Sequence, residues 1–165
     1  MSRYFKYNYL NPNNFGTRVP FFRGCRAPLA NHLKNLDDWY TFSGQTGLWI
    51  LEDNVVNMQG AIKIEDGQTL CIAQDVLLQL IQDINTGSPR IRVLPGGKLN
   101  IYGTVKYFAT PGGSAFMNII GGDVLVRAGG SLINTNTGGG NGIINFNSGT
   151  FVNRGTFKNK GTTTI

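Results

Sequence analysis

Three pairs of neighbouring carboxylates are the groups in this chain best suited to acid–base chemistry. They are Asp37-Asp38, Glu52-Asp53 and Glu65-Asp66. A general acid and a general base must face each other across the bond that they cleave. Neighbours along a strand point to opposite faces, so a pair can act together only where a turn brings its members to one side. Residues 124–165 contain no acid and no histidine, and we therefore predict that the chain is not an enzyme.

Histidine and cysteine are too scarce to predict a metal or redox centre. His32 is the single histidine, and no candidate triad lies beside it in the sequence. A histidine of this kind is commonly a surface or hydrogen-bonded residue. Cys25 and Cys71 are too few for a disulfide framework and lack metal-ligand spacing, so we expect both to be reduced. No cofactor is predicted.

Aromatic and basic side chains alternate along residues 1–24, which show neither a helical nor a strand period. Disordered tails usually lack aromatics, whereas protein interfaces are rich in Tyr, Phe and Arg. We interpret these residues as an extended arm that binds a neighbouring subunit or folds back over its own body, and the sequence leaves both alternatives open. The predicted partner-binding residues are Arg3, Tyr4, Phe5, Lys6, Tyr7, Tyr9, Phe15, Arg18, Phe21, Phe22 and Arg23.

Two other classes of partner fit these residue types. Rings interleaved with Lys and Arg also suit single-stranded nucleic acid, whose bases stack on aromatic side chains. No nucleic-acid-binding fold is indicated around the arm, which weakens that interpretation. Carbohydrate is the second class, and it rests on Trp39, Trp49 and Tyr102.

The net charge of +6 is unevenly distributed along the chain. Residues 1–36 carry six Lys or Arg and no acid, residues 37–123 carry five against all nine acids, and residues 124–165 carry four and no acid. The three balances are thus +6, −4 and +4. A basic arm is attracted to nucleic acid, membrane surfaces and acidic proteins, and charge alone does not choose among them.

The element that must position these residues is a short repeat between Ile62 and Asn153. It reads apolar, any, apolar, two of any, Gly, two of any, apolar. Alternation puts the apolar residues on one side of a strand, and glycine takes positive φ at a corner without a Cβ penalty. Each copy therefore predicts two short strands and one bend. The copies begin at Ile62, Ile91, Val124 and Ile144, and their glycines are Gly67, Gly96, Gly129 and Gly149.

Stacking of the copies predicts an all-β fold, a short parallel β-helix or β-solenoid with one or two short helices and an extended N-terminal arm. Equivalent strands about 4.8 Å apart bury a continuous core that one copy cannot bury alone. Aligning the copies puts Glu65 over Leu94, Arg127 and Asn147 rather than over further acids. The predicted divisions are 1–45 for the arm and a capping helix, and 46–165 for the body.

Two segments have helical spacing of apolar residues. Residues 28–40 predict a short helix that covers one end or flank of the body. Residues 75–84 predict an amphipathic helix with Asp75 as its N-cap, although the same run is compatible with a buried strand.

Glycine-led units give the chain a resemblance to a known class of protein. Residues 149–162, Gly-Thr-Phe-Val-Asn-Arg-Gly-Thr-Phe-Lys-Asn-Lys-Gly-Thr, and residues 96–105, Gly-Gly-Lys-Leu-Asn-Ile-Tyr-Gly-Thr-Val, resemble the coils of β-solenoid surface and fibre proteins. Such coils occur in filamentous adhesins and in capsid-associated proteins of large viruses. This chain differs from the adhesins in its shortness and in its lack of the apolar run of a secretion signal.

The resemblance implies a minor structural protein of a virion, assembled in the host cytoplasm. Its implied partners are other structural proteins of the capsid, or further copies of itself, bound through the arm. A carbohydrate-binding or adhesin-like fibre module is the alternative, followed by a polysaccharide-degrading β-helix enzyme that would use clustered acids. No stretch approaches the roughly 18 apolar residues of a membrane span, so none is expected.

Overall fold

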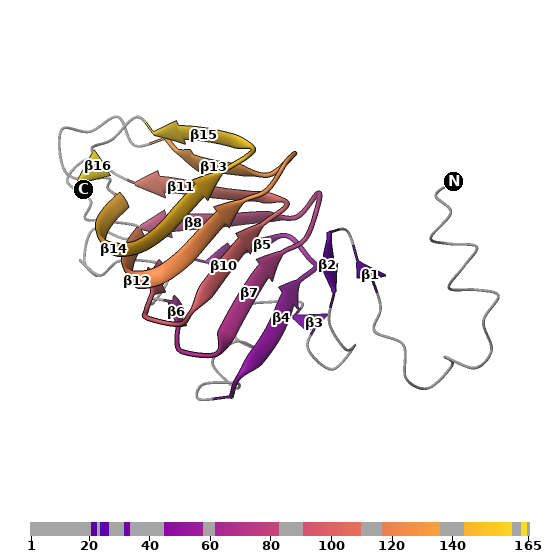
Figure 1. Ribbon diagram of the computed structural model, residues 1–165. Coiled ribbons are helices and arrows are strands. Elements are labelled where there is room, and N and C mark those ends of the chain that lie inside the picture. Colours follow the sequence, from indigo (N-terminus) through magenta and orange to yellow (C-terminus); the bar gives the residue numbers. More distant parts are fainter. Residues whose placement is uncertain are drawn as a thin grey trace.

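The computed structural model describes residues 21–22, 24–26, 32–33, 45–57, 62–82, 91–109, 117–135, 144–159 and 163–164. These residues form strands and connecting turns, with no helix among them (Figure 1). None of the described elements is therefore a helix of the length and apolarity needed to cross a membrane.

Sixteen strands follow one another along the described parts of the chain. The early strands are β1 (Phe21–Phe22), β2 (Cys25–Arg26), β3 (His32–Leu33), β4 (Gly47–Leu51), β5 (Val55–Asn57), β6 (Ile62–Ile64), β7 (Gln68–Ile72) and β8 (Leu77–Gln82). The later strands are β9 (Ile91–Val93), β10 (Lys98–Ile101), β11 (Thr104–Ala109), β12 (Met117–Val126), β13 (Ser131–Asn134), β14 (Ile144–Asn153), β15 (Thr156–Asn159) and β16 (Thr163–Thr164).

Gly67, Gly96 and Gly129 lie in turns, as predicted, whereas Gly149 lies within β14, so the turn predicted there is wrong. Gly67, Gly96, Gly129 and Gly149 all have positive φ, at 73°, 78°, 83° and 104°. Alternation around the first of them is also as predicted, since Ile62, Ile64, Leu70 and Ile72 are fully buried. A side chain at any of these four positions would strain the backbone, which is why glycine recurs there.

The strands form two large parallel sheets. A nine-stranded sheet has the order β16-β14-β12-β10-β7-β4-β3, with β9 joined to β12 and β6 joined to β9. A five-stranded sheet has the order β15-β13-β11-β8-β5. All pairs in both sheets are parallel, and the larger sheet is curled (Figure 1). Apolar side chains from both sheets form one buried core.

The predicted β-solenoid is wrong as a description of this architecture. A solenoid made of the repeat would need a corner between the two strands of every copy. Instead, β12 continues without interruption through Gly121 and Gly122, and it pairs with β9 near its start and with β10 near its end. The strands before and after the predicted corner, such as β6 and β7, therefore belong to the same curled sheet. The described residues form this sheet and a second parallel sheet rather than the faces of a solenoid.

Both predicted helices are also wrong where the structure describes them. Residues 77–82 of the predicted helix at 75–84 form β8, which pairs with β5 and β11. Leu78 and Leu80 are buried while Leu77 and Gln79 are partly exposed, so the period is two. In the predicted helix at 28–40, His32 and Leu33 form β3, which pairs with β4. The rest of that segment lies outside the described residues.

The third and fourth copies of the repeat align differently from the sequence prediction. Val124 pairs with Leu99 of β10 and not with Ile91 of β9. The partner of Ile91 is Met117, which lies in the first part of β12. Register shifts near Ile120 then turn Phe151 toward the core, beside Val124, in place of the predicted Val152. A one-residue shift moves every side chain to the opposite face of a strand. The predicted stacking of Glu65 over Arg127 is also wrong, because Glu65 follows β6, which pairs with β9, whereas Arg127 follows the part of β12 that pairs with β10.

Candidate functional site

The predicted partner-binding residues fall mostly outside the described part of the chain. Phe21 and Phe22 form the backbone of β1, which pairs with Cys25 and Arg26 of β2 in antiparallel register. The other predicted residues lie outside the described residues: Arg3, Tyr4, Phe5, Lys6, Tyr7, Tyr9, Phe15, Arg18 and Arg23. The structure therefore describes how the arm ends rather than how the arm binds.

Gly24 lies in the turn immediately before β2 of the β1–β2 hairpin. Gly24 has φ of 90°, a conformation that suits glycine in tight hairpin turns. The hairpin lies over the body, because a Cβ atom at Gly24 would collide with the ring of Tyr102. Glycine is thus required here both by the backbone conformation and by the close approach of the ring.

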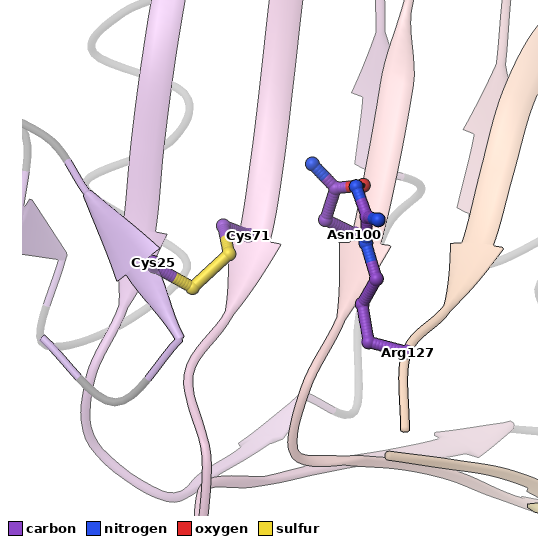
Figure 2. Close-up of a disulfide and its surroundings, with 4 residues drawn as sticks. All are labelled: Cys25, Cys71, Asn100 and Arg127. Carbon is purple, nitrogen blue, oxygen red and sulfur yellow. A yellow bond between two sulfur atoms is a disulfide. The ribbon is translucent and has the colours of Figure 1, made fainter. Parts of the chain in front are cut away.

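A disulfide joins Cys25 of the hairpin to Cys71 of β7 (Figure 2). The sequence prediction that both cysteines are reduced is wrong. The Cα atoms lie 6.2 Å apart, and both side chains are buried, with exposed fractions of 2% and 1%. The two cysteines are 46 residues apart in the sequence, so their proximity depends on the hairpin folding back over β7. Spacing alone could not reveal it.

Polar and aromatic side chains border the disulfide. Arg127 Nη2 donates a hydrogen bond to Asn100 Oδ1 at 3.4 Å, and its guanidinium carbon lies 5.7 Å from the centre of the Tyr102 ring. Figure 2 shows Arg127 and Asn100 beside the disulfide on the neighbouring part of the sheet. We call Gly24, Cys25, Cys71, Tyr102 and Arg127 the anchor site. It fixes the base of the arm to the outer face of the curled sheet.

One signal in the sequence does indicate that the outer face of the curled sheet is covered over β4 and β7. Trp49-Ile50-Leu51 and Leu70-Cys71-Ile72 are continuous apolar runs, and all six residues are buried. Strands buried on both faces read as apolar runs, whereas strands with one exposed face alternate. On the next strand Asn100 interrupts the run between Leu99 and Ile101, and Asn100 is partly exposed. The outer face is therefore covered over β4 and β7 and becomes open at β10.

His32 on β3 forms a hydrogen bond with Glu52, at the β3 edge of the curled sheet. Its Nδ1 atom lies 2.8 Å from Glu52 Oε2, and the side chains are 6% and 20% exposed. The Glu52 backbone N–H donates to the carbonyl of Leu33 at 3.1 Å. These contacts hold β3 against the turn that follows β4, in agreement with the prediction of a hydrogen-bonded histidine.

The carboxylate pairs do not converge on one place. Glu52 and Asp53 follow the end of β4, whereas Glu65 and Asp66 precede the start of the parallel strand β7. Five residues of strand separate these two ends, about 17 Å at 3.3 Å per residue. Asp37 and Asp38 lie outside the described residues. Among the residues that are described, no group of three His, Cys, Asp or Glu side chains could hold a metal ion.

The aromatic residues proposed for carbohydrate binding are mostly covered. Trp49 is 2% exposed and belongs to the core, so its ring has no face for a sugar. Tyr102 is partly buried between the hairpin and Arg127. Trp39 lies outside the described residues. Phe108 on β11 is the exposed large hydrophobic residue of the described chain, at 49%.

Comparison of the chain with known proteins identifies no similar protein. No family model matches the chain, and no curated protein or solved structure matches it.

Proposed function

We propose that this chain is a non-catalytic structural protein that binds neighbouring subunits of a large assembly, such as a virus particle, through its N-terminal arm. The observation that carries the proposal is the anchor site. The disulfide between Cys25 and Cys71 joins the end of the arm to the two-sheet body. A segment fixed at one end loses less conformational freedom on binding than a free tail, which favours docking.

The composition of residues 1–20 supplies the binding groups. Tyr4, Phe5, Tyr7, Tyr9 and Phe15 would enter pockets on the neighbour, and the basic side chains would meet polar rims. Buried aromatic anchors with Arg carry most of the binding energy in protein interfaces. Among the described carboxylates, Glu52 and Asp53 lie at the opposite end of the strands from Glu65 and Asp66.

The test removes the arm and keeps its anchor. A chain of residues 21–165 retains the hairpin and both cysteines, so it is expected to fold with the thermal midpoint of the full chain. We expect it to be absent from assemblies that take up the full chain at fixed stoichiometry. Incorporation of the truncated chain at the same stoichiometry would refute the proposal.

A matched pair of variants separates the arm from general surface hydrophobicity. Replacing Tyr4, Phe5 and Tyr7 by Ser should reduce incorporation at least about tenfold, because each lost interface anchor typically costs more than 1 kcal/mol. Phe108→Ser removes an exposed ring from the body and should leave incorporation unchanged. Equal effects of the two changes would count against a specific role of the arm.

A further inference from the structure

One corner of the body carries a column of side chains that includes two arginines. Tyr102, Arg127 and Arg154 come directly after β10, β12 and β14, which are neighbours in the curled sheet. Each of the three donates its backbone N–H to the preceding strand of the sheet, at 3.0, 2.9 and 2.8 Å, and the acceptors are the carbonyls of Ile72, Ile101 and Val126, in that order. Neighbouring strands lie about 4.8 Å apart, so the two arginines start from backbone positions at this spacing.

Neither arginine is neutralised by an acid within the described chain. Arg154 is exposed, and the guanidinium of Arg127 contacts Asn100 and the ring of Tyr102. No salt bridge joins either arginine to another described residue. Residues 124–165 contain no acid at all. Two neighbouring cations that have no acid beside them attract an anion.

The surface beside the column offers a hydrogen-bond donor and apolar contacts. Asn100, Leu125 and Val152 occupy one row across β10, β12 and β14, and each is partly exposed. Asn100 uses its side-chain oxygen to accept the hydrogen bond from Arg127. Figure 2 shows the amide nitrogen of Asn100 directed away from Arg127, so its N–H groups stay available as donors.

No free aromatic ring lies beside the two arginines in the described part of the chain. The ring of Tyr102 contacts the hairpin at Gly24 and the guanidinium of Arg127. Proteins that bind single-stranded nucleic acid stack its bases on exposed rings, so this corner lacks the surface that a base needs. The arm does not suit this corner either, because residues 1–20 carry basic side chains and no acid. The arrangement favours a ligand that is held through its anionic and hydroxyl groups.

We propose that this corner binds a linear acidic polysaccharide, with sulfate or carboxylate groups of the sugar chain on the guanidinium groups of Arg127 and Arg154. Guanidinium binds such oxyanions through paired, charge-assisted hydrogen bonds. The amide of Asn100 donates to a hydroxyl group, and Leu125 and Val152 contact the C–H face of a sugar ring. The sugar chain runs across β10, β12 and β14, because the two arginines succeed each other in that direction.

This binding goes beyond the proposed function, and titration calorimetry measures it on the purified full-length chain. The probes are size-defined acidic oligosaccharides of two kinds, one sulfated and derived from heparin, the other a carboxylated oligogalacturonate. The comparators are uncharged dextran and two polymers of matched charge, oligo-dT and polyglutamate. We expect at least one acidic oligosaccharide to bind more tightly than every comparator, and the tighter of the two identifies the anionic group. Equal or tighter binding of a comparator, or no binding of either oligosaccharide, would overturn the proposal.

Two double variants separate a specific site from the general basic charge of the chain. Arg127→Gln with Arg154→Gln should weaken binding of the preferred oligosaccharide about tenfold or more, because hydrogen bonds to charged groups are lost. Lys106→Gln with Lys158→Gln lowers the net charge equally, from +6 to +4, but on β11 and β15 of the other sheet. It should weaken binding less than about threefold, because distant exposed charges are screened.

Thermal unfolding of each variant verifies that it is folded. Arg154 and Lys158 are both exposed, so the single changes Arg154→Gln and Lys158→Gln repeat the comparison without disturbing the contact between Arg127 and Tyr102. The change at Arg154 should weaken binding more than the change at Lys158. Equal losses in the arginine and lysine variants would show that charge alone is responsible and would overturn the proposal.

Discussion

Breaking the disulfide between Cys25 and Cys71 should lower the free energy of unfolding by about 4 kcal/mol. The disulfide connects residues 46 positions apart, and the entropy of closing a loop of this length in the unfolded chain corresponds to about 4 kcal/mol at 25 °C. For a domain of this size, 1 kcal/mol shifts the thermal midpoint by about 2–4 °C. Reduction should therefore lower the midpoint by about 8–16 °C.

The assay compares thermal and urea unfolding with and without a reductant that does not absorb light. The control is the variant with Cys25→Ala and Cys71→Ala, which should unfold near the reduced wild-type chain and be insensitive to reductant. Labelling of the oxidised, denatured chain with a thiol reagent should detect no free thiol. Two free thiols per chain, or a wild-type midpoint that reductant leaves unchanged, would refute the account of the anchor site.

Two further substitutions test the packing. Gly24→Ala should lower the free energy of unfolding by at least about 2 kcal/mol, because it combines a strained positive φ with a collision with the Tyr102 ring. The control, Gly129→Ala, has open space around its Cβ position and should cost about 1 kcal/mol. Equal costs in urea unfolding would contradict the contact between Gly24 and Tyr102. Leu70→Ala should lower the free energy of unfolding by about 3 kcal/mol, because Leu70 is fully buried. Lys98 on the next strand is exposed, and Lys98→Ala should lower it by less than about 0.5 kcal/mol. Similar thermal midpoints of the two variants would contradict the assigned faces.

Local structure was predictable where one residue type has one physical reason to occur. Gly67, Gly96 and Gly129 could be assigned to turns because glycine takes positive φ without a Cβ penalty, whereas Gly149 has positive φ inside strand β14. Ile62 and Ile64 could be assigned to one buried face by their alternation. These signals lie within a few residues of chain, so no knowledge of distant contacts is needed to interpret them.

The predictions failed where distant parts of the chain decide the outcome. The run at 75–84 predicts a helix and is also compatible with a strand, and pairing of its residues 77–82 with β5 and β11 makes that part a strand. The strand β12 pairs with both β9 and β10, and these neighbours cannot be identified from the local sequence of β12. The anchor site is the clearest case, because a hairpin turn at Gly24 brings Cys25 to Cys71 across 46 residues.

The continuous apolar runs around Ile50 and Cys71 were the available clue to that site. They indicate a second covered face on β4 and β7, although they do not identify the covering segment. The partner-binding residues of the arm stay a prediction from composition.

Cross-linking of the intact assembly tests the binding of neighbours by the arm most directly. A lysine-reactive reagent should link Lys6 of the arm to a different protein or to another copy of the chain, at a site recovered reproducibly by mass spectrometry. The exposed Lys98 of the body serves as the reference for the contacts of the body surface. Links from Lys6 to a neighbouring subunit are the predicted result. Links from Lys6 to the body of its own chain alone, established with mixed isotope-labelled copies, would contradict it.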